Sequence, residues 1–201
     1  MKRIAVLGST GSIGTSCLEV LDGLRHEMTL VGVTARRRWQ QLAAQSHDFA
    51  IPRAVLSDTS LNGQVQRDAF HAGTQLTYGP DQIEQLAAAD DVDVVVSAIA
   101  GAAGLRGTWA AVEAGKTIAI ANKETLVVAG PLVVEKAAQT GAKLLPVDSE
   151  HSAIFQALQA GQRRDVKRII LTSSGGPCRG WSREQIEAVT PDAALRHPTW
   201  D

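Results

Sequence analysis

Two carboxylates separated by a single residue are the clearest chemical feature of this sequence. Asp148 and Glu150 lie on either side of Ser149, directly after the apolar run 144–147 and before His151. Negative charge at the end of a buried strand is costly unless a cation or a polar substrate meets it. The pattern therefore predicts a divalent-cation site at Asp148 and Glu150. The alternative is that Ser149 caps a helix that starts near Glu150.

A glycine-rich segment, GSTGSIG at Gly8–Gly14, follows the first apolar run of the chain. Glycines between a strand and a helix let the backbone turn tightly and approach a pyrophosphate, whose charge is met by free N–H groups at the helix start. The spacing differs from the commoner G-x-G-x-x-G, so its position at the first strand–helix junction carries the argument. We predict a dinucleotide site here, and a glycine turn without a ligand is the alternative.

The residues after the second predicted strand indicate which dinucleotide, NAD or NADP, the site would bind. An NAD site usually has an acidic residue there for the ribose 2′-hydroxyl, whereas an NADP site has cations for the 2′-phosphate. In this chain Arg36, Arg37 and Arg38 follow the strand, with no acidic residue at its end. Cations at a helix start oppose the helix dipole, and guanidinium groups bind phosphate through charge-assisted hydrogen bonds. Phosphate binding therefore explains the arginines better than a solvated helix start, and we predict NADPH.

Two further predicted strands are expected to end at the same edge of the sheet as the glycine-rich segment. Residues 98–104 are small apart from Ile99, and the strand at 117–121 is followed by Asn122, Lys123 and Glu124. In open α/β sheets the ligand lies beyond the carboxyl ends of the strands, so we expect these three side chains to face the cofactor or the substrate. Asn122 also suits a helix cap, and the two roles are compatible.

Two segments late in the chain have weaker signals. Ser173–Pro177 offers hydroxyls and backbone N–H groups that suit an anion, although alone it is only a glycine turn. His197 suits a substrate hydrogen bond or proton transfer, and Trp200 would cover it. A histidine in such a Pro-rich loop is more often simply exposed.

The elements that must position these residues alternate as in βαβ units around a parallel sheet. Short Val/Ile/Leu runs predict strands at 3–7, 29–33, 54–57, 92–98, 117–121, 143–147 and 167–172. Longer Ala/Leu/Glu-rich stretches predict helices at 12–24, 39–47, 82–88, 104–114, 125–140 and 150–160. We therefore expect an α/β fold, with a Rossmann-like NADP-binding domain and a mostly parallel sheet at 1–147. The composition changes after Val147, so residues 148–201 are expected to begin a second domain.

Composition narrows the class of protein. The 201 residues are 44% hydrophobic with a net charge of −1, so no overall field attracts nucleic acid or an anionic membrane. No apolar run approaches the roughly 20 residues of a membrane span, and the start lacks a signal-peptide core. Cys17 and Cys178 match no metal or redox spacing, which suits a reducing compartment. We expect a soluble, cytoplasmic protein with no nucleic-acid or membrane partner, and a homodimer when intact.

Six segments, taken in order, resemble the 1-deoxy-D-xylulose 5-phosphate reductoisomerase family of the non-mevalonate isoprenoid pathway. They are GSTGSIG at Gly8–Gly14, AIAGAAGL at Ala98–Leu105, ANKETLV at Ala121–Val127, LLPVDSEHSAIFQ at Leu144–Gln156, SGGP at Ser174–Pro177 and HPTW at His197–Trp200. The resemblance covers every segment of the chain. It implies an NADPH-dependent enzyme that uses Mg²⁺ or Mn²⁺ to rearrange 1-deoxy-D-xylulose 5-phosphate and then reduces the product to 2-C-methyl-D-erythritol 4-phosphate. It also implies that residues 148–201 begin an α+β catalytic domain.

The resemblance implies roles for individual residues. Those facing NADPH would be Thr10, Gly11, Ser12 and Ile13 at the phosphates, Arg36, Arg37 and Arg38 at the adenosine 2′-phosphate, and Asn122, Lys123 and Glu124 at the nicotinamide side. The metal ligands would be Asp148 and Glu150. The substrate contacts would be Ser149, Glu150, Ser174, His197 and Trp200, with Trp200 in a flexible flap and with Asp148, Glu150 and His197 as catalytic residues.

Two departures from the family pattern matter. The family usually has glycine and asparagine where Arg36 and Arg38 stand, so the adenosine pocket is expected to differ in shape while NADPH remains preferred. The family also continues beyond the HPTW segment with residues that bind the substrate phosphate and supply a third metal carboxylate. We therefore expect this chain alone to bind metal weakly and to lack full activity.

Two other functions are alternatives to this one. The first is a stand-alone NADP-binding module without catalysis, which would bind nucleotide indifferently to divalent metal. The second is another NADP-dependent reductase such as aspartate-semialdehyde dehydrogenase, which needs a nucleophilic cysteine. Neither Cys17 nor Cys178 has a plausible setting for a nucleophile, which disfavours the second alternative.

Overall fold

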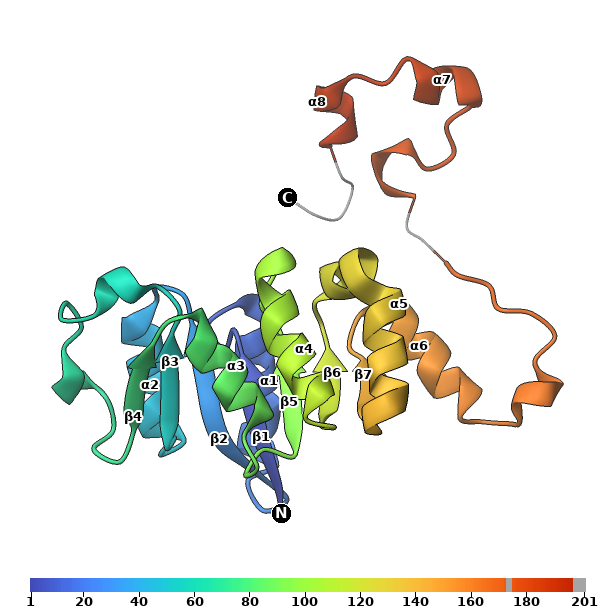
Figure 1. Ribbon diagram of the computed structural model, residues 1–201. Coiled ribbons are helices and arrows are strands. Elements are labelled where there is room, and N and C mark those ends of the chain that lie inside the picture. Colours follow the sequence, from blue (N-terminus) through green and yellow to red (C-terminus); the bar gives the residue numbers. More distant parts are fainter. Residues whose placement is uncertain (173–174, 197–201) are drawn as a thin grey trace. The chain divides into compact units, whose positions relative to one another are not determined.

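The computed structural model describes residues 1–172 and 175–196, which fall into two compact units, Met1–Ser152 and Ala153–Asp201. The first unit is built on one seven-stranded sheet in which every strand pair is parallel, in the order β4-β3-β2-β1-β5-β6-β7 (Figure 1). The strands are β1 (Lys2–Leu7), β2 (Met28–Ala35), β3 (Arg53–Leu56), β4 (Gln75–Tyr78), β5 (Val94–Ser97), β6 (Thr117–Ile120) and β7 (Lys143–Pro146). The α/β, Rossmann-like prediction for this part of the chain is confirmed.

Helices cover both faces of this sheet (Figure 1). They are α1 (Ser12–Gly23), α2 (Trp39–Asp48), α3 (Pro80–Ala88), α4 (Leu105–Glu113) and α5 (Lys123–Thr140), with α6 (Ser149–Leu158) beginning at the end of the unit. Single 3₁₀ turns form η1 (Thr59–Leu61), η2 (Arg67–Ala69) and η3 (Ala102–Gly104). The predicted helices are confirmed, with ends shifted by a few residues.

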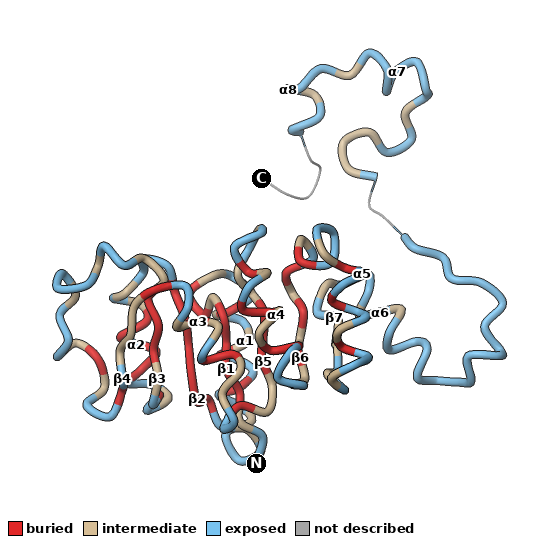
Figure 2. The backbone as a smooth tube through the Cα atoms, viewed as in Figure 1, coloured by how far each residue is buried: buried red, intermediate tan, exposed pale blue. Residues whose placement is uncertain are grey.

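Alternate side chains along each strand point to opposite faces of the sheet and pack in two separate hydrophobic cores. On one face Leu7, Val95 and Ile118 pack with apolar residues of α3, α4 and α5. On the other face Val6 and Val33 pack with residues of α1 and α2. Figure 2 shows this burial concentrated in the strands and in the helix sides that face them. Because both strand faces are covered, the strands have continuous apolar sequences, and this is why they could be located from sequence.

Two strand predictions need correction. β4 is not predicted from the sequence: it is an edge strand, and its residues Gln75–Tyr78 are exposed or only partly buried and mix polar with apolar types. Conversely, a strand was predicted at 167–172, but these residues form no regular structure and are exposed. A strand needs a hydrogen-bonded neighbour, and residues 153–172 and 175–196 contain no other strand that could pair with this apolar run.

The regular elements in the described part of the second unit are short helices. After α6 come η4 (Arg163–Asp165), η5 (Gly176–Cys178), α7 (Arg183–Glu187) and α8 (Pro191–Ala194). A capping box between Ser182 and Gln185 starts α7, and the Thr190 side chain caps α8. No helix in the described ranges is long and apolar enough to cross a membrane.

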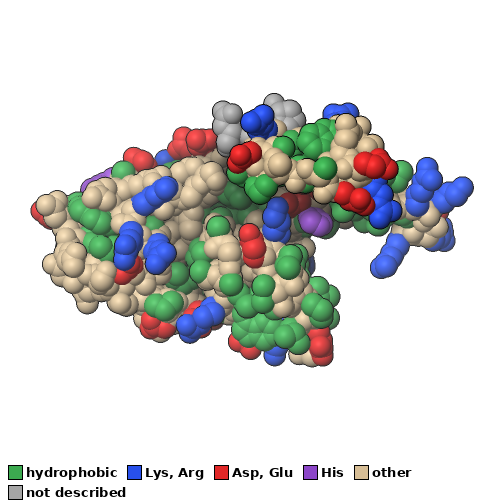
Figure 3. All heavy atoms as spheres, turned by 90° about the horizontal axis from the view of Figure 1, so that it is seen from above, with side chains coloured by type: hydrophobic (Ala, Val, Ile, Leu, Met, Phe, Trp, Pro, Cys, Tyr) green, Lys and Arg blue, Asp and Glu red, His purple; other side chains and the backbone are tan. Residues whose placement is uncertain are grey.

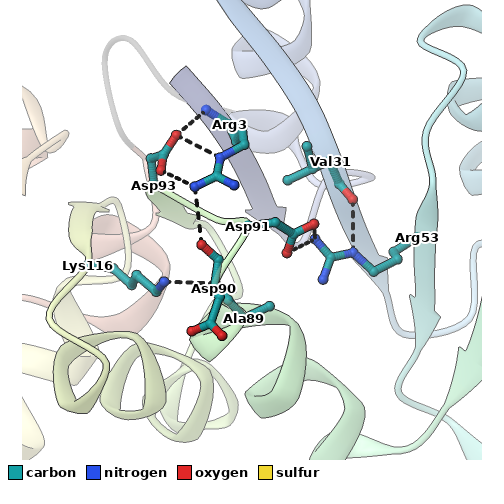
Figure 4. Close-up of polar contacts among 8 residues, drawn as sticks. All are labelled: Arg3, Val31, Arg53, Ala89, Asp90, Asp91, Asp93 and Lys116. Carbon is teal, nitrogen blue, oxygen red and sulfur yellow. Dashed lines mark hydrogen bonds and ion pairs between the residues drawn. The ribbon is translucent and has the colours of Figure 1, made fainter. Parts of the chain in front are cut away.

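The amino-terminal edge of the sheet is held by ion pairs to the segment between α3 and β5 (Figure 4). The Arg3 guanidinium reaches the Asp93 carboxylate at 2.7 Å, and the Arg3 backbone N–H donates to the same carboxylate at 2.8 Å. Arg53 of β3 donates to both oxygens of Asp91 at 2.8 Å. Lys116, before β6, donates to the Ala89 carbonyl at 2.7 Å. These contacts connect β1, β3 and the start of β6 through one short segment.

The Asp93 carboxylate should make stability depend on pH. Hydrogen bonds from the Arg3 side chain, and then from its backbone, hold the Asp93 pKa well below its usual value. Because the folded-state pKa is the lower one, the stabilisation is present above about pH 4 and is lost as pH falls further. We expect Asp93→Asn to lower the midpoint of thermal unfolding at pH 7, and the difference from wild type to shrink toward pH 3.

Asp90→Asn is the matched control, because only the backbone carbonyl of Asp90 accepts from Arg3. It should leave the midpoint at pH 7 nearly unchanged. An Asp93→Asn variant as stable as wild type at pH 7 would contradict the role given to this ion pair.

Candidate functional site

A cavity of about 470 Å³ opens at the carboxyl ends of β1, β5, β6 and β7. It is lined by Gly11, Ser12, Ile13, Ala98, Ile99, Ala100, Ala121, Asn122, Lys123, Glu124, Val147, Asp148 and Ser149. Four segments that the sequence analysis singled out separately thus meet in one place. Figure 3 looks down on this edge and shows basic side chains gathered over the half of the sheet that contains β2 and β3.

The loop between β1 and α1 is shaped for close approach. Gly8 has φ +86°, a conformation that side chains with a Cβ rarely adopt, and its N–H donates to the Thr34 hydroxyl at 2.9 Å. The Ser9 N–H donates to the Thr34 carbonyl at 2.9 Å. The first intrahelical bond of α1 runs from Thr15 to Gly11, so the N–H groups of residues 12–14 have no partner within the helix. Free N–H groups at a helix start are suited to meet an anion, and these lie beside the cavity.

The three arginines after β2 take three different positions. Arg38 donates through Nη1 to the Thr10 carbonyl at 2.8 Å, so it contacts the glycine loop itself. Arg37 pairs through Nε with the Asp58 carboxylate. Arg36 is exposed, and its side chain has no hydrogen bond or ion pair to any residue in 1–172 or 175–196. The three arginines therefore do not form one equivalent phosphate-binding group: the Arg38 Nη1 is used by the loop, the Arg37 Nε is used by Asp58, and the Arg36 guanidinium has no partner in the described residues.

Asp58 was missed from the sequence. It follows β3, which pairs with β2, and its carboxylate is only 13% exposed. Hydrogen bonds from the Ser60 hydroxyl, Arg37 and the Ser60 backbone lower the Asp58 pKa to about 2. The carboxylate is therefore charged at neutral pH and anchors Arg37 by one edge. The two terminal nitrogens of Arg37 remain as donors.

Asn122 lies at the cavity, but its side chain is occupied. It is 2% exposed, its Nδ2 donates to the carbonyls of Ile99 and Gly101 at 2.6 and 3.0 Å, and its Oδ1 accepts from the Thr125 N–H at 3.3 Å. The Asn122 side chain thus caps α5 and also fixes the loop after β5. A Cβ at Gly104 would lie 2.1 Å from Nδ2, so the glycine there is required by this contact.

Asp148 caps α6, so the alternative in which Ser149 is the cap is wrong. The Asp148 Oδ1 accepts from the His151 backbone N–H at 3.3 Å and contacts the His151 Nδ1 at 2.8 Å. These two hydrogen bonds are the main reason why the Asp148 pKa is lowered. The second carboxylate oxygen lies 4.0 Å from Lys123 Nζ. The Ser149 hydroxyl donates to the adjacent Glu150 carboxylate at 2.8 Å.

These residues offer an incomplete set of ligands for a divalent cation. Asp148 lines the cavity, whereas Glu150 is exposed and does not line it, and no group of three or more His, Cys, Asp or Glu side chains converges anywhere in the described ranges. A hard cation takes six or more oxygen ligands, so two carboxylates fit such an ion only in part. Ser174, His197 and Trp200, the remaining predicted site residues, lie outside the described residues.

The two cysteines have settings unlike that of a nucleophile. Cys17 is part of α1, and burial raises its thiol pKa, which disfavours the thiolate. Cys178 is a half-buried residue of η5. Neither cysteine lines the cavity at the carboxyl edge.

Gly14 gives a test of the loop geometry. An added Cβ would lie 2.3 Å from the Gly8 carbonyl oxygen and 2.6 Å from the Ser9 Cα, both backbone atoms that cannot move aside alone. We expect Gly14→Ala to lower the free energy of unfolding by about 1–3 kcal/mol, measured in urea. In the same helix, Gly23 has nothing within 4 Å of an added Cβ. Gly23→Ala should therefore be neutral or stabilising, and equal losses in both variants would contradict the close approach.

Comparison with known proteins agrees with this geometry. The family model described as 1-deoxy-D-xylulose 5-phosphate reductoisomerase matches residues 4–130, and the model of that enzyme's C-terminal domain matches residues 144–201. Curated relatives of that name include one from Laribacter hongkongensis, 45% identical, and one from Chlorobium chlorochromatii, 49% identical. Both matches cover 100% of this chain but only 53% and 52% of the relatives. The chain thus spans about half the length of these relatives.

Solved structures give the same result. The reductoisomerase from Zymomonas mobilis in complex with NADPH matches with a TM-score of 0.87 and 38% identity, over 98% of this chain and 52% of that one. A DOX-P reductoisomerase in complex with NADPH, fosmidomycin and magnesium matches with a TM-score of 0.83 and 36% identity, over 100% of this chain and 52% of that one. With the family model covering well over half of its residues, this chain belongs to the 1-deoxy-D-xylulose 5-phosphate reductoisomerase family.

Proposed function

We propose that the intact protein uses NADPH and a divalent cation, Mn²⁺ or Mg²⁺, to isomerise and reduce 1-deoxy-D-xylulose 5-phosphate to 2-C-methyl-D-erythritol 4-phosphate. The observation that carries the proposal is the meeting of the glycine loop, the 122–124 segment and the Asp148 segment in one cavity. In this proposal residues 1–147 are the NADPH-binding domain, and residues 148–201 begin the catalytic, metal-binding domain. The complexes of related enzymes with NADPH and magnesium support it.

The donors around the glycine loop fit NADPH. Free N–H groups at the start of α1 would meet the pyrophosphate, with Thr10, Gly11, Ser12 and Ile13 as the contact residues. Arg36 and the free edge of Arg37 would bind the 2′-phosphate, while Arg38 supports the loop by holding the Thr10 carbonyl. Lys123 and Glu124 would face the nicotinamide side, with Asn122 holding the loop beside them.

The residues after β7 fit the chemistry of a keto sugar phosphate. Asp148 and Glu150 would hold the cation, whose charge polarises a carbonyl and neutralises a developing oxyanion when it is bound. Ser149 lines the same cavity and would contact the substrate. Roles for Ser174, His197 and Trp200 in substrate binding, and for His197 in catalysis, remain part of the proposal. The expected homodimer and cytoplasmic location stay predictions.

A comparison of the affinities for NADPH and NADH tests the cofactor assignment. We expect the chain to bind NADPH more tightly than NADH, because only NADPH has the 2′-phosphate that Arg36 and Arg37 would meet. Removing both charges in Arg36→Gln/Arg37→Gln should weaken NADPH binding roughly tenfold or more, with NADH binding little changed. Quenching of tryptophan fluorescence, or calorimetric titration, measures both affinities.

Arg53→Gln is the matched control, because Arg53 lies at the opposite edge of the sheet, paired with Asp91. It removes a charge of the same sign and should leave both affinities unchanged. Equal weakening of NADPH and NADH in the double variant, or no binding of either nucleotide by wild type, would refute the cofactor assignment.

Metal binding gives a second test. Because no three His, Cys, Asp or Glu side chains converge in the described residues, we expect this chain to bind Mn²⁺ weakly, with a dissociation constant of about 1 mM or above. Asp148→Asn should abolish that binding, as followed by the electron paramagnetic resonance signal of free Mn²⁺. Asp192→Asn, an exposed residue of α8, is the control. Micromolar affinity that survives Asp148→Asn would place the metal elsewhere.

The activity of the intact protein separates this proposal from a nucleotide-binding module without catalysis. We expect consumption of NADPH with 1-deoxy-D-xylulose 5-phosphate that requires Mn²⁺ or Mg²⁺. Nucleotide binding without any turnover of that substrate would favour the binding module instead.

A further inference from the structure

A buried glutamine of α2 contacts the glycine loop. Gln45 is 6% exposed although its side chain is polar, and burial of an amide is costly unless its hydrogen bonds are made. Both ends of the amide bond to one residue, Ser9, which lies 36 positions earlier and is fully buried. The Ser9 hydroxyl donates to Gln45 Oε1 at 2.7 Å, and Gln45 Nε2 donates to the Ser9 carbonyl at 3.0 Å.

This pairing fixes the orientation of a peptide group in the loop. In a planar trans peptide the C=O and the following N–H point in opposite directions. Because the Ser9 carbonyl is held toward α2, the Thr10 N–H is directed away from α2. That N–H has no acceptor within the described parts of the chain, so it is one of the donors that the loop leaves available.

The neighbouring peptide groups are held by β2 and by the cap residue of α2. The Ser9 N–H donates to the Thr34 carbonyl, and the Gly8 N–H donates to the Thr34 hydroxyl, both at 2.9 Å. Arg38, at the start of α2, donates to the Thr10 carbonyl at 2.8 Å. Two successive carbonyls of the loop, those of Ser9 and Thr10, are therefore held by side chains from one helix and its cap position.

We propose that Gln45 is a positioning residue, which acts through Ser9 to hold the phosphate-binding loop in the form that receives the pyrophosphate of the nucleotide. This inference rests on the proposed function, because it assumes that NADPH is the ligand. Gln45 does not touch the nucleotide itself. Its effect falls on the part of the ligand that NADPH and NADH share, whereas Arg36 and Arg37 act on the 2′-phosphate.

The test is the pair of nucleotide affinities in Gln45→Met, which keeps the shape of the side chain and removes both hydrogen bonds. We expect the dissociation constants for NADPH and NADH to rise by the same factor, roughly tenfold, so that their ratio is unchanged. Gln40→Met is the matched control, because Gln40 is an exposed residue of the same helix. It should bind both nucleotides as wild type does.

A milder variant covers the case in which Gln45→Met does not fold. Ser9→Ala removes the bond to Oε1 but keeps the bond from Nε2 to the carbonyl, so both affinities should fall together by a smaller factor. Unchanged affinity in Gln45→Met, or a loss confined to NADPH, overturns the inference. So does unchanged affinity in Ser9→Ala when that variant is the one that folds.

Amide hydrogen exchange separates this inference from the cofactor assignment, because it needs no nucleotide. In Gln45→Met, or in Ser9→Ala if only that variant folds, the Gly8 and Ser9 amides should exchange faster than in wild type. The exchange rates of the β5 amides should not change. If wild type binds neither nucleotide, the cofactor assignment fails, and exchange still reports whether Gln45 holds the loop. Unchanged exchange at Gly8 and Ser9 overturns that role.

Discussion

The close approach of α1 to the end of β1 is the constraint on which the rest of this site depends. Gly14 in the first turn of the helix lies so near the Gly8 carbonyl that a single methyl group would not fit. This approach directs the first N–H groups of the helix across the carboxyl edge of the sheet, where β5, β6 and β7 also end. The positive helix end and the loops after three strands therefore share one cavity, as is usual for ligands of open parallel sheets.

Buried polar side chains hold each loop at this edge. Thr34 and Gln45 fix the glycine loop, and Asn122 fixes the loop after β5 while capping α5. Each of them satisfies backbone groups that would otherwise be buried without partners. Because these buried side chains hold the loops, the exposed Arg36 side chain at the same edge is free to meet a ligand.

The sheet could be predicted because strands covered on both faces have continuous apolar runs. β4 lacked that signal because it lies at the edge and is half-buried, and the apolar run at 167–172 gave a false one because strand formation depends on a partner elsewhere in the chain. The site segments were located from their positions after strands. Which neighbour caps α6, Asp148 or Ser149, depends on a helix start that sequence locates only to within a few residues.

Contacts between distant residues explain most of what the sequence could not show. The pairing of Arg37 with Asp58 requires β2 and β3 to be neighbours, and the bonds between Gln45 and Ser9 require α2 to pack beside the glycine loop. Asp58 had a usable signal, an acidic residue following the strand next to β2. Gln45 had none, because a glutamine in an amphipathic helix reads as a surface residue until the loop is packed against it.

The ion pairs of the amino-terminal edge have a consequence for changing this protein. Arg3, Arg53 and Lys116 act at the end of the sheet opposite the cavity, where none of the predicted site residues within Met1–Ser152 lies. These ion pairs and the cavity therefore lie at opposite ends of the same strands. An engineer could raise thermal tolerance by redesigning charges at one end while the cavity end keeps its sequence, which avoids the usual trade-off between stability and activity.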